Sequence, residues 1–416
     1  MLINRPIIFK ILTLFLNFLF YKILTDNLAP DLFGKIIYFF SISMSISILS
    51  NLGSDTIISK IYLKKFGEDI LKGKINYHQF HFITLIISIL VSPIISIIYG
   101  FNNFEDILII TIVSFSLTNA KVFGANFLSI KNYFYYYYYS VFGFLFCIVL
   151  SIFLFKNLTH ILLFSSFLMN FFILLMNFKF KFLYLRNFFK IQNLNIDKLK
   201  FTITNTLPFI IILYLAASHE LIGHYWLNRN FNYELVGQSV LLHRIASLTV
   251  LGLAAMNLVA YSSFNKIEIH YFDKNSLKEY LNILFISLFF SIIVIFFLFL
   301  TYKFILIWFN LPLDKNIILS LSVLITGQFI VICFGPVAMA MTQFGNQKSF
   351  AIIYILGCIL NFIILFSYEK INSYYDTDPL IFSSFAYSLT FIFINLVALT
   401  YLLILKKIKE DVKKIG

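Results

Sequence analysis

Long apolar stretches recur from one end of the chain to the other, separated by short segments rich in charges and turn residues. A stretch of about 18 or more apolar residues can cross a hydrocarbon core of roughly 30 Å as a helix. Cutting the chain at its polar segments predicts twelve such helices, with no room for a soluble domain between them. The expected spans are 6–25, 35–58, 79–98, 106–128, 133–155, 160–177, 201–225, 236–263, 281–302, 316–341, 349–367 and 380–405.

The basic residues lie mainly in alternate segments between these spans. With a cytoplasmic N-terminus, most of the 32 Lys and Arg residues fall on the cytoplasmic side, including those of 60–74, 179–200 and 406–414. Cytoplasmic loops retain positive charge, and one missed helix would invert every later segment. We therefore expect an even number of spans with both termini in the cytoplasm. The net charge of +13 follows from this topology and needs no nucleic-acid partner.

Composition agrees with a membrane protein and excludes several other classes. Hydrophobic residues make up 60% of the chain and charged residues 12%, whereas a soluble domain carries about 25% charged residues. Cys147, Cys333 and Cys358 are far apart in apolar stretches, which argues against a disulfide framework or a cysteine metal site. No phosphate-binding glycine loop is present. We expect no enzymatic activity and no cofactor, and leave H⁺ or Na⁺ coupling open.

The chain divides near its middle. The longest expected cytoplasmic segment, 178–200, has six spans on either side, which predicts an N-terminal six-helix bundle at 1–200 and a C-terminal six-helix bundle at 201–416. Asp-Leu-Phe-Gly at 31–34 is echoed by Glu-Leu-Val-Gly at 234–237, each before the second span of its half. Internal repeats of this kind are usual in secondary transporters.

Polar residues follow one face of each of the first two spans. Helical spacing places Lys10, Thr13, Asn17 and Tyr21 on a common face, with Lys22 at the outer end. In the second span the polar residues are Ser43, Ser47, Ser50 and Ser54, with Asn51 and Asp55 beside them. Such stripes either line a hydrophilic cavity or hold neighbouring helices together by close packing and hydrogen bonds.

The seventh and eighth spans hold the densest group of ionisable residues: His219, Glu220, His224, Gln238, His243 and Arg244. Glu220 and His224 are four residues apart on one helix face and could share a proton or pair ionically. The five-residue spacing of His219 and His224 differs from the zinc-protease signature. The alternative is that these groups are simply solvated near the outer membrane surface.

Arg244 is the strongest candidate for binding an anion. It lies deep in its expected span, and arginine forms a bidentate fork with phosphate without losing its charge. Lys10 and Lys121 lie closer to the expected cytoplasmic ends, and we interpret them as residues that snorkel to the interface.

Three groups of residues resemble one transporter family. The first is Leu-Ala-Pro-Asp-Leu-Phe-Gly at 28–34 with Leu-Ser-Asn-Leu-Gly-Ser-Asp at 49–55; the second is Leu-Pro at 207–208 with Val-Gly-Gln-Ser-Val at 236–240. The third runs from Gly-Pro at 335–336 through Phe-Gly-Asn-Gln-Lys at 344–348 to Asn361. The chain thereby resembles bacterial polysaccharide flippases of the Wzx type, in the multidrug/oligosaccharidyl-lipid/polysaccharide exporter (MOP) superfamily. The family often carries an aspartate midway along the seventh span, where this chain has Glu220.

This resemblance implies two six-helix bundles in a MATE-like V, opening alternately to either side of the bacterial inner membrane. The implied substrate is an undecaprenyl-pyrophosphate-linked oligosaccharide, flipped from the inner to the outer leaflet for O-antigen or capsule assembly. The implied partners are membrane lipids, a polysaccharide polymerase and a chain-length regulator. The candidate cavity residues are Arg244, Lys10, Asn17, Lys22, His243, Asp55, Glu220 and His224.

Two alternatives stay open. A cation-coupled multidrug exporter of the same superfamily would favour carboxylates inside the spans. In this chain the expected spans contain two acidic residues, Asp55 and Glu220, and three basic residues, Lys10, Lys121 and Arg244. A membrane-embedded polysaccharide polymerase or ligase would favour a large folded outer loop, and the expected outer loops are short.

Overall fold

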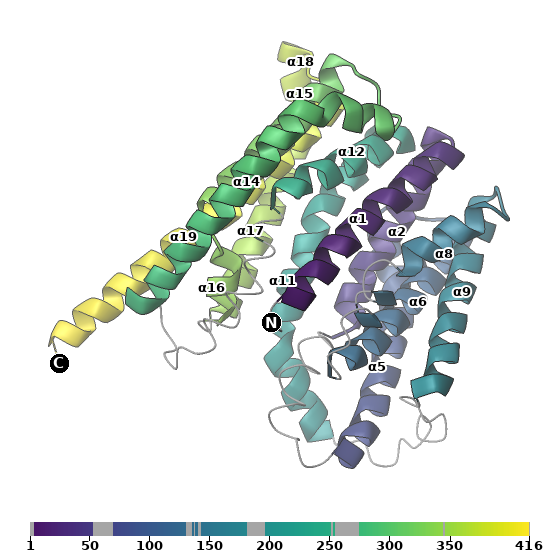
Figure 1. Cartoon of the computed structure of the whole chain (residues 1–416), viewed down its shortest axis with the longest axis horizontal. Coiled ribbons are helices and arrows are strands. Elements are labelled where there is room, and N and C mark those ends of the chain that lie inside the picture. Colours follow the sequence, from purple (N-terminus) through teal and green to yellow (C-terminus); the bar gives the residue numbers. More distant parts are fainter. Residues whose placement is uncertain are drawn as a thin grey trace. The chain divides into compact units, whose positions relative to one another are not determined.

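The computed structural model describes residues 4–52, 70–129, 135–136, 138–139, 143–180, 196–250, 253, 274–343 and 346–415. These residues form helices and turns, without a β-strand. They confirm the all-α fold that the sequence predicts, and each of the twelve expected spans overlaps a described helix (Figure 1). Among the described helices, nine are long and apolar enough to cross a membrane.

The chain forms two compact units, Met1–Tyr214 and Leu215–Gly416. The division falls inside the long helix at Ile196–Asn230, and the boundary predicted after residue 200 lies nearer the start of the same helix. The first unit contains α1 (Asn4–Asn27), α2 (Pro30–Ser50), α5 (Ile70–Ile98), α6 (Phe104–Ser129), α8 (Gly143–Ile152), α9 (Leu158–Phe180) and the first part of α11 (Ile196–Asn230).

The second unit contains the rest of α11 and a set of helices drawn in teal to yellow in Figure 1. They are α12 (Tyr233–Ala246), the 3-10 turn η4 (Ser247–Val250), α14 (Lys274–Trp308), α15 (Lys315–Cys333), α16 (Val337–Gln343), α17 (Gln347–Phe366), α18 (Tyr368–Tyr375) and α19 (Pro379–Ile415). Helix α19 packs on α15 and α17, and α15 also contacts α12 and α14.

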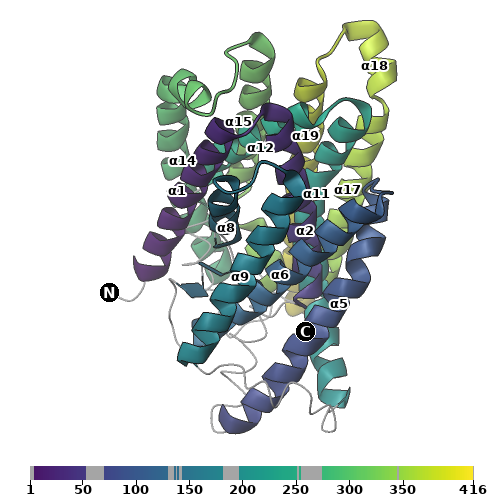
Figure 2. The ribbon, with the colours of Figure 1, turned by 90° about the vertical axis from the view of Figure 1, so that its right-hand side faces the viewer.

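In the first unit, α6 is the central helix. It packs against α2, α5 and α9, while α8 packs against α9 and α1 (Figure 2). The three serines Ser43, Ser47 and Ser50 of α2 are fully buried. Ser43 Oγ donates to the carbonyl of Ile110 on α6 at 3.4 Å, and Ser47 Oγ donates within its own helix to Met44. Among these described serines, Ser43 bonds to another helix, as the helix-packing alternative predicts, whereas the Ser50 hydroxyl is buried without a hydrogen-bond partner.

Local sequence signals explain where several helices begin. The side chain of Asn232 accepts the N–H of Leu235 at 2.9 Å at the start of α12, and Asp314 accepts the N–H of Ile317 at 2.7 Å at the start of α15. Short polar side chains at this position satisfy a backbone donor that has no partner within the helix. Helix α2 begins with Pro30, which needs no donor there.

The repeated four-residue motif occupies the same local position in both units. Asp31 lies in the first turn of α2, and Glu234 lies in the first turn of α12. Negative charge in the first turn stabilises the positive end of the helix dipole. The glycines Gly34 and Gly237 that close the two motifs are both buried.

One expected span is wrong in detail. The stretch 316–341 forms two helices, α15 and α16, rather than one. Gly335 adopts a left-handed backbone conformation with φ of 78°, and Pro336 follows it without a backbone donor. The hydroxyl of Tyr280 on α14 donates to the carbonyl of Phe334, which no longer has a helical partner.

Candidate functional site

The candidate site of the second unit is a group of ionisable and aromatic side chains brought together by α11, α12, α15 and α19. Glu220, His219 and His224 come from α11, and His243 and Arg244 come from the last turn of α12. Polar residues inside a spanning helix are unfavourable unless they face protein or a water-filled cavity. The arrangement therefore identifies the faces of α11 and α12 that turn away from lipid.

Glu220 pairs with Arg244 across the two helices. Nη2 of Arg244 lies 3.3 Å from Oε1 of Glu220, and the side chains are 39% and 22% exposed, respectively. The separation is longer than that of a charge-assisted hydrogen bond, so the contact is an ion pair without a hydrogen bond. The guanidinium thus neutralises the carboxylate while keeping more than a third of its own surface accessible.

The pairing of Glu220 with His224 that the sequence suggested is not formed among the described residues. Both ring nitrogens of His224 are buried without a hydrogen-bond partner. Its ring instead packs edge-on against His243, with the ring centroids 5.8 Å apart. Arg244 rather than His224 pairs with Glu220, because the long arginine side chain reaches across from α12 and its charge is permanent.

His219 has a structural position. Its Nε2 lies 2.5 Å from Oγ1 of Thr390 on α19, and its backbone carbonyl accepts the side-chain amide of Asn361 on α17 at 3.0 Å. Its ring packs on Tyr387, with centroids 4.8 Å apart. These contacts tie α11 to α17 and α19 and leave little of His219 exposed.

His243 is enclosed by rings. Tyr387 of α19 lies edge-on to it, with centroids 4.4 Å apart, and Gln328 is a buried amide on the neighbouring helix α15. Sequence reasoning missed Tyr387, Gln328, Thr390 and Asn361 as parts of this cluster. All four are polar residues within largely apolar helices, but α15 and α19 also carry other polar residues, so the sequence does not single them out. Gln238 was also singled out, and its side-chain amide donates to Glu234, one turn earlier on α12, at 3.3 Å.

The first unit holds a second polar network that sequence reasoning also missed. Nε2 of His81 on α5 lies 2.9 Å from Oδ1 of Asn119 on α6. Asn119 donates to Asn170 of α9 at 2.7 Å, and Asn170 donates to Ser116 of α6 at 2.8 Å. His81 is fully buried. The chain of amides links three helices, which is how polar residues join helices in a membrane protein.

The predicted residues of α1 have mixed outcomes. Thr13 and Tyr21 are buried, so this helix face turns into its unit, and Oδ1 of Asn17 is buried without a hydrogen-bond partner. Lys22 instead forms an ion pair with Asp26, 2.5 Å away on the same helix. The side chain of Lys10 and the whole of Asp55 lie outside the described part of the chain.

The interpretation of Lys121 as a snorkelling residue is wrong. Its side chain is only 5% exposed, and Nζ lies 3.5 Å from the carbonyl of Met44 on α2. Packing of α2 over α6 covers this position, so the side chain stays within the protein. Lys121 lies inside a candidate span of the first unit, and Arg244 lies in the last turn of α12, a 14-residue helix of the second unit.

Comparisons with known proteins identify the fold. No protein-family model and no curated protein sequence matches the chain. Solved structures do match: an inward-facing conformation of a multidrug resistance MATE family transporter of the MOP superfamily has a TM-score of 0.59 at 13% identity, covering 93% of each chain. An outward-facing conformation of such a transporter has a TM-score of 0.59 at 13% identity, covering 100% of this chain and 96% of the other.

A MOP superfamily transporter from Pyrococcus furiosus also matches, with a TM-score of 0.54 at 12% identity, covering 97% of this chain and 94% of the other. Its description reports a binding pocket of reversed polarity that suggests a different function. The chain is similar to these transporters over nearly its whole length. It therefore has the fold of these transporters, which solved structures record in inward-facing and outward-facing conformations.

Proposed function

We propose that the protein is a flippase that moves a lipid-linked oligosaccharide with a pyrophosphate group from the inner to the outer leaflet of the bacterial cytoplasmic membrane. The lipid would be undecaprenyl pyrophosphate, and the product would serve O-antigen or capsule assembly. Transport would follow the alternating access for which the fold is known. In this proposal both termini lie in the cytoplasm.

The sign of the charge inside the spans carries the proposal. Among the described residues, Glu220 is the one acidic side chain more than a turn inside a candidate span, and Arg244 already neutralises it. Lys121 adds a buried cation in the other unit. Intramembrane cations of this kind mark pathways for anions, and a pyrophosphate group is such an anion.

The physics of the step agrees with a protein-lined route. Each sugar hydroxyl carried unpaired through hydrocarbon would cost several kcal/mol, so the head group needs polar surroundings while the lipid tail can remain in the bilayer. Moving about two negative charges outward across about 100 mV, inside negative, would release roughly 4–5 kcal/mol. The membrane potential would therefore assist the flip.

The second candidate is a cation-coupled multidrug exporter, because two of the matching structures are described as multidrug resistance transporters. Recognition of a cationic drug would favour an accessible carboxylate, whereas Glu220 is paired with Arg244. The Pyrococcus furiosus structure is described by a reversed pocket polarity. Pocket polarity therefore differs among proteins of this fold. The sign of the charge inside the spans distinguishes a flippase for an anionic lipid from an exporter of cationic drugs.

The two functions are separable with purified protein in vesicles. One set would contain a fluorescent polyprenyl-pyrophosphate-linked disaccharide, with an enzyme outside the vesicles that modifies only sugar in the outer leaflet. A second set would be tested for uptake of ethidium under a proton or sodium gradient. We expect the protein to accelerate lipid flipping and not ethidium movement. Ethidium transport without flipping would establish the multidrug function instead.

A further inference from the structure

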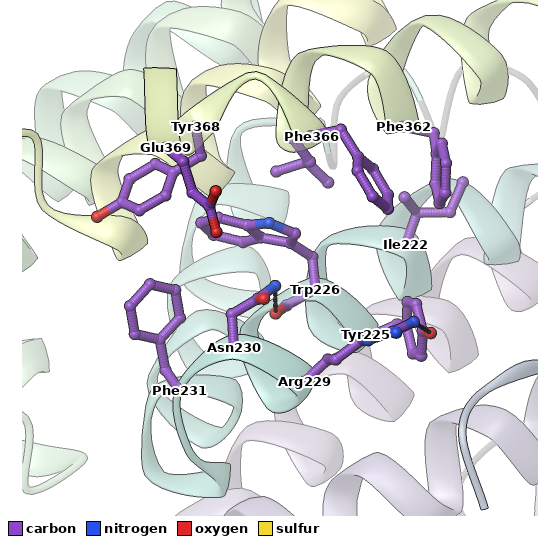
Figure 3. Close-up of a pocket in the computed structure, with 11 residues that line it drawn as sticks. Ile222, Tyr225, Trp226, Arg229, Asn230, Phe231, Phe362, Phe366, Tyr368 and Glu369 are labelled. Carbon is purple, nitrogen blue, oxygen red and sulfur yellow. Dashed lines mark hydrogen bonds between the residues drawn. The ribbon is translucent and has the colours of Figure 1, made fainter. Parts of the chain in front are cut away.

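We propose that a pocket at the end of α11 in the second unit is a carbohydrate site. This inference rests on the proposed function, because it assigns the sugar head group of the same substrate to named residues. The pocket has a volume of about 490 Å³ and lies between the last turns of α11, the end of α17 and the start of α18 (Figure 3). In the expected topology this end of α11 faces the outer side of the membrane.

The size suits one or two sugar rings. Pockets for small molecules typically measure roughly 300–1,000 Å³ and combine apolar walls with a few converging polar groups. Here the apolar wall is aromatic. Trp226 packs edge-on against Tyr368, with centroids 4.9 Å apart, and against Phe231, with centroids 5.4 Å apart. Phe362 and Phe366 form another wall, with centroids 4.3 Å apart.

Polar groups of both hydrogen-bonding types face the same space. The indole N–H of Trp226 and the carboxylate of Glu369 have no hydrogen-bond partner among the described residues, and the amide oxygen of Asn230 is likewise unused. Figure 3 shows Trp226 among the lining residues, with Glu369 and Tyr368 above it and Asn230 below. The pocket thus offers a free donor from the indole and free acceptors from the carboxylate and the amide.

A basic group shares the pocket with Glu369. The guanidinium of Arg229 lies 5.9 Å from the ring centroid of Tyr225, and its Nη1 donates to the Tyr225 hydroxyl at 2.6 Å. Tyr368 stays a neutral phenol, since burial and the nearby carboxylates of Asp378 and Asp376 raise the pKa of its hydroxyl. That hydroxyl donates to the carbonyl of Thr377 at 2.9 Å and is therefore already used.

The balance of charges selects the class of ligand. A cation would be attracted by the aromatic rings and by Glu369 but repelled by Arg229. An anion would be attracted by Arg229 but repelled by Glu369. A neutral ring bearing many hydroxyls can donate to Glu369 and Asn230 and accept from Trp226 and Arg229 at once. Its apolar face can lie on an aromatic side chain, which carries both an apolar body and a polar tip. A sugar has these properties.

The chain provides its own reporter for this site. It contains two tryptophans, Trp226 in the pocket and Trp308 at the end of α14. In a Trp308→Phe variant, all tryptophan fluorescence comes from the pocket. The purified variant in detergent would be titrated with galactose, N-acetylglucosamine and lactose, and separately with choline and inorganic phosphate. We expect saturable fluorescence changes with at least one sugar and none with the two ions.

Two further variants in the Trp308→Phe background test the assignment of residues. Glu369→Gln should weaken sugar binding at least tenfold, since a hydrogen bond to a charged group contributes roughly 1.5–3 kcal/mol and about 1.4 kcal/mol corresponds to a factor of ten. Glu279→Gln, on α14 and away from the pocket lining, is the matched control and should leave binding unchanged. Saturation by choline or phosphate alone, absence of a response to all three sugars, or an equal effect of both variants would overturn the carbohydrate site.

Failure of this site can be told apart from failure of the flippase function. In the vesicle assay, Glu369→Gln should flip the disaccharide-linked lipid more slowly than the parent protein, while a lipid with pyrophosphate and no sugar should move equally in both. If the parent protein flips the glycolipid and Glu369→Gln does so at the same rate, the pocket is not a sugar site, although the flippase function stands. If the parent protein moves no glycolipid, the function itself is wrong.

Discussion

Nη2 of Arg244 on α12 lies 3.3 Å from Oε1 of Glu220 on α11. The contact joins consecutive helices of one unit and brings together the two charges that the sequence singled out separately as candidate site residues. It also leaves Arg244 as the more exposed partner, with 39% of its side chain accessible against 22% for Glu220. Stability and transport should therefore depend on the two residues in different ways.

The first prediction concerns stability. Removal of one partner leaves a partly buried charge without compensation, whereas removal of both leaves none. Breaking a buried pair costs about 3–5 kcal/mol, and an exposed pair contributes about 0.2–1 kcal/mol. For this half-exposed pair we expect Arg244→Leu to lower the free energy of unfolding by about 1–3 kcal/mol, between those limits. Unfolding in mixed detergent and dodecyl sulfate measures it.

The double variant Glu220→Leu/Arg244→Leu is the control for this prediction. It should be more stable than Arg244→Leu alone, because the carboxylate that lost its partner is also gone. If the losses of the two single variants simply add in the double variant, the side chains contribute independently and the ion pair has no energetic role.

The second prediction concerns transport. Arg244→Ala should abolish surface polysaccharide in cells that depend on this protein, and Arg244→Lys should restore only part of it. Lysine keeps the charge but loses the planar fork that matches phosphate oxygens. The measurement is the accumulation of lipid-linked oligosaccharide in the inner leaflet, with the amount of folded protein held equal. Full rescue by lysine would contradict a bidentate contact with the substrate.

Glu220→Gln distinguishes the flippase from the multidrug exporter. The substitution removes the negative charge that neutralises Arg244 while keeping the size of the side chain. A flippase for an anionic lipid should retain flipping in this variant, since the cation that meets the substrate remains. An exporter that binds cations at Glu220 should lose drug transport altogether.

The third prediction concerns close packing of α15 and α19. A Cβ added at Gly327 would lie 2.5 Å from Cβ and 3.2 Å from Cα of Ser388. Alanine normally stabilises a helix by about 1 kcal/mol relative to glycine, but here its methyl group would meet backbone. We expect Gly327→Ala to lower the temperature of unfolding and the folded yield, and Ser388→Gly to restore both in the double variant.

Gly223 provides a matched comparison for Gly327. A Cβ at this position of α11 would approach only the hydroxyl of Ser383 on α19, at 2.9 Å. A hydroxyl can rotate away, so Gly223→Ala should be tolerated and keep a normal unfolding temperature. Equal damage from both substitutions would mean that neither close approach is the cause.

The positions of the helices could be predicted from the sequence, but their lateral contacts could not. Apolar length alone places a helix in each expected span, as the described helices confirm. Lys121 was interpreted as a snorkelling residue from its distance to a helix end. That distance does not reveal that α2 covers the side chain. His224 was named as a possible partner of Glu220 because helical spacing is visible in a sequence, whereas Arg244 reaches Glu220 from another helix.

The fourth prediction is the topology. Reporter fusions at Lys65, Asn193, Asn275 and Lys409 should report the cytoplasm, and fusions at Asn102, Asn230 and Asp376 the periplasm. This pattern follows from the excess of basic residues in alternate segments. A reproducible reversal at any one site would contradict the twelve-span assignment. A reversal at Asn230 would also place the proposed sugar pocket on the other side of the membrane.

The fifth prediction concerns the network of the first unit. Asn119 lies between His81 on α5, at 2.9 Å, and Asn170 on α9, at 2.7 Å. Asn119→Leu keeps a similar volume but removes the partner of both neighbours. Hydrogen bonds between membrane helices contribute about 0.6 kcal/mol on average and up to about 1.7 kcal/mol. Because two such bonds are lost, we expect a loss in the free energy of unfolding near the upper value.

Thr111→Val on the same helix is the control for this network. Oγ1 of Thr111 donates only to the carbonyl of Ile107 one turn earlier, at 2.8 Å, so its loss should change the free energy of unfolding by a few tenths of a kcal/mol at most. Asn119→Asp separates the two contacts, because it keeps an acceptor for His81 but replaces the donor to Asn170 with a second acceptor. Asn119→Asp should therefore lower the free energy of unfolding at neutral pH. Equal losses in the free energy of unfolding for Asn119→Leu and Thr111→Val would show that the network does not hold these helices together.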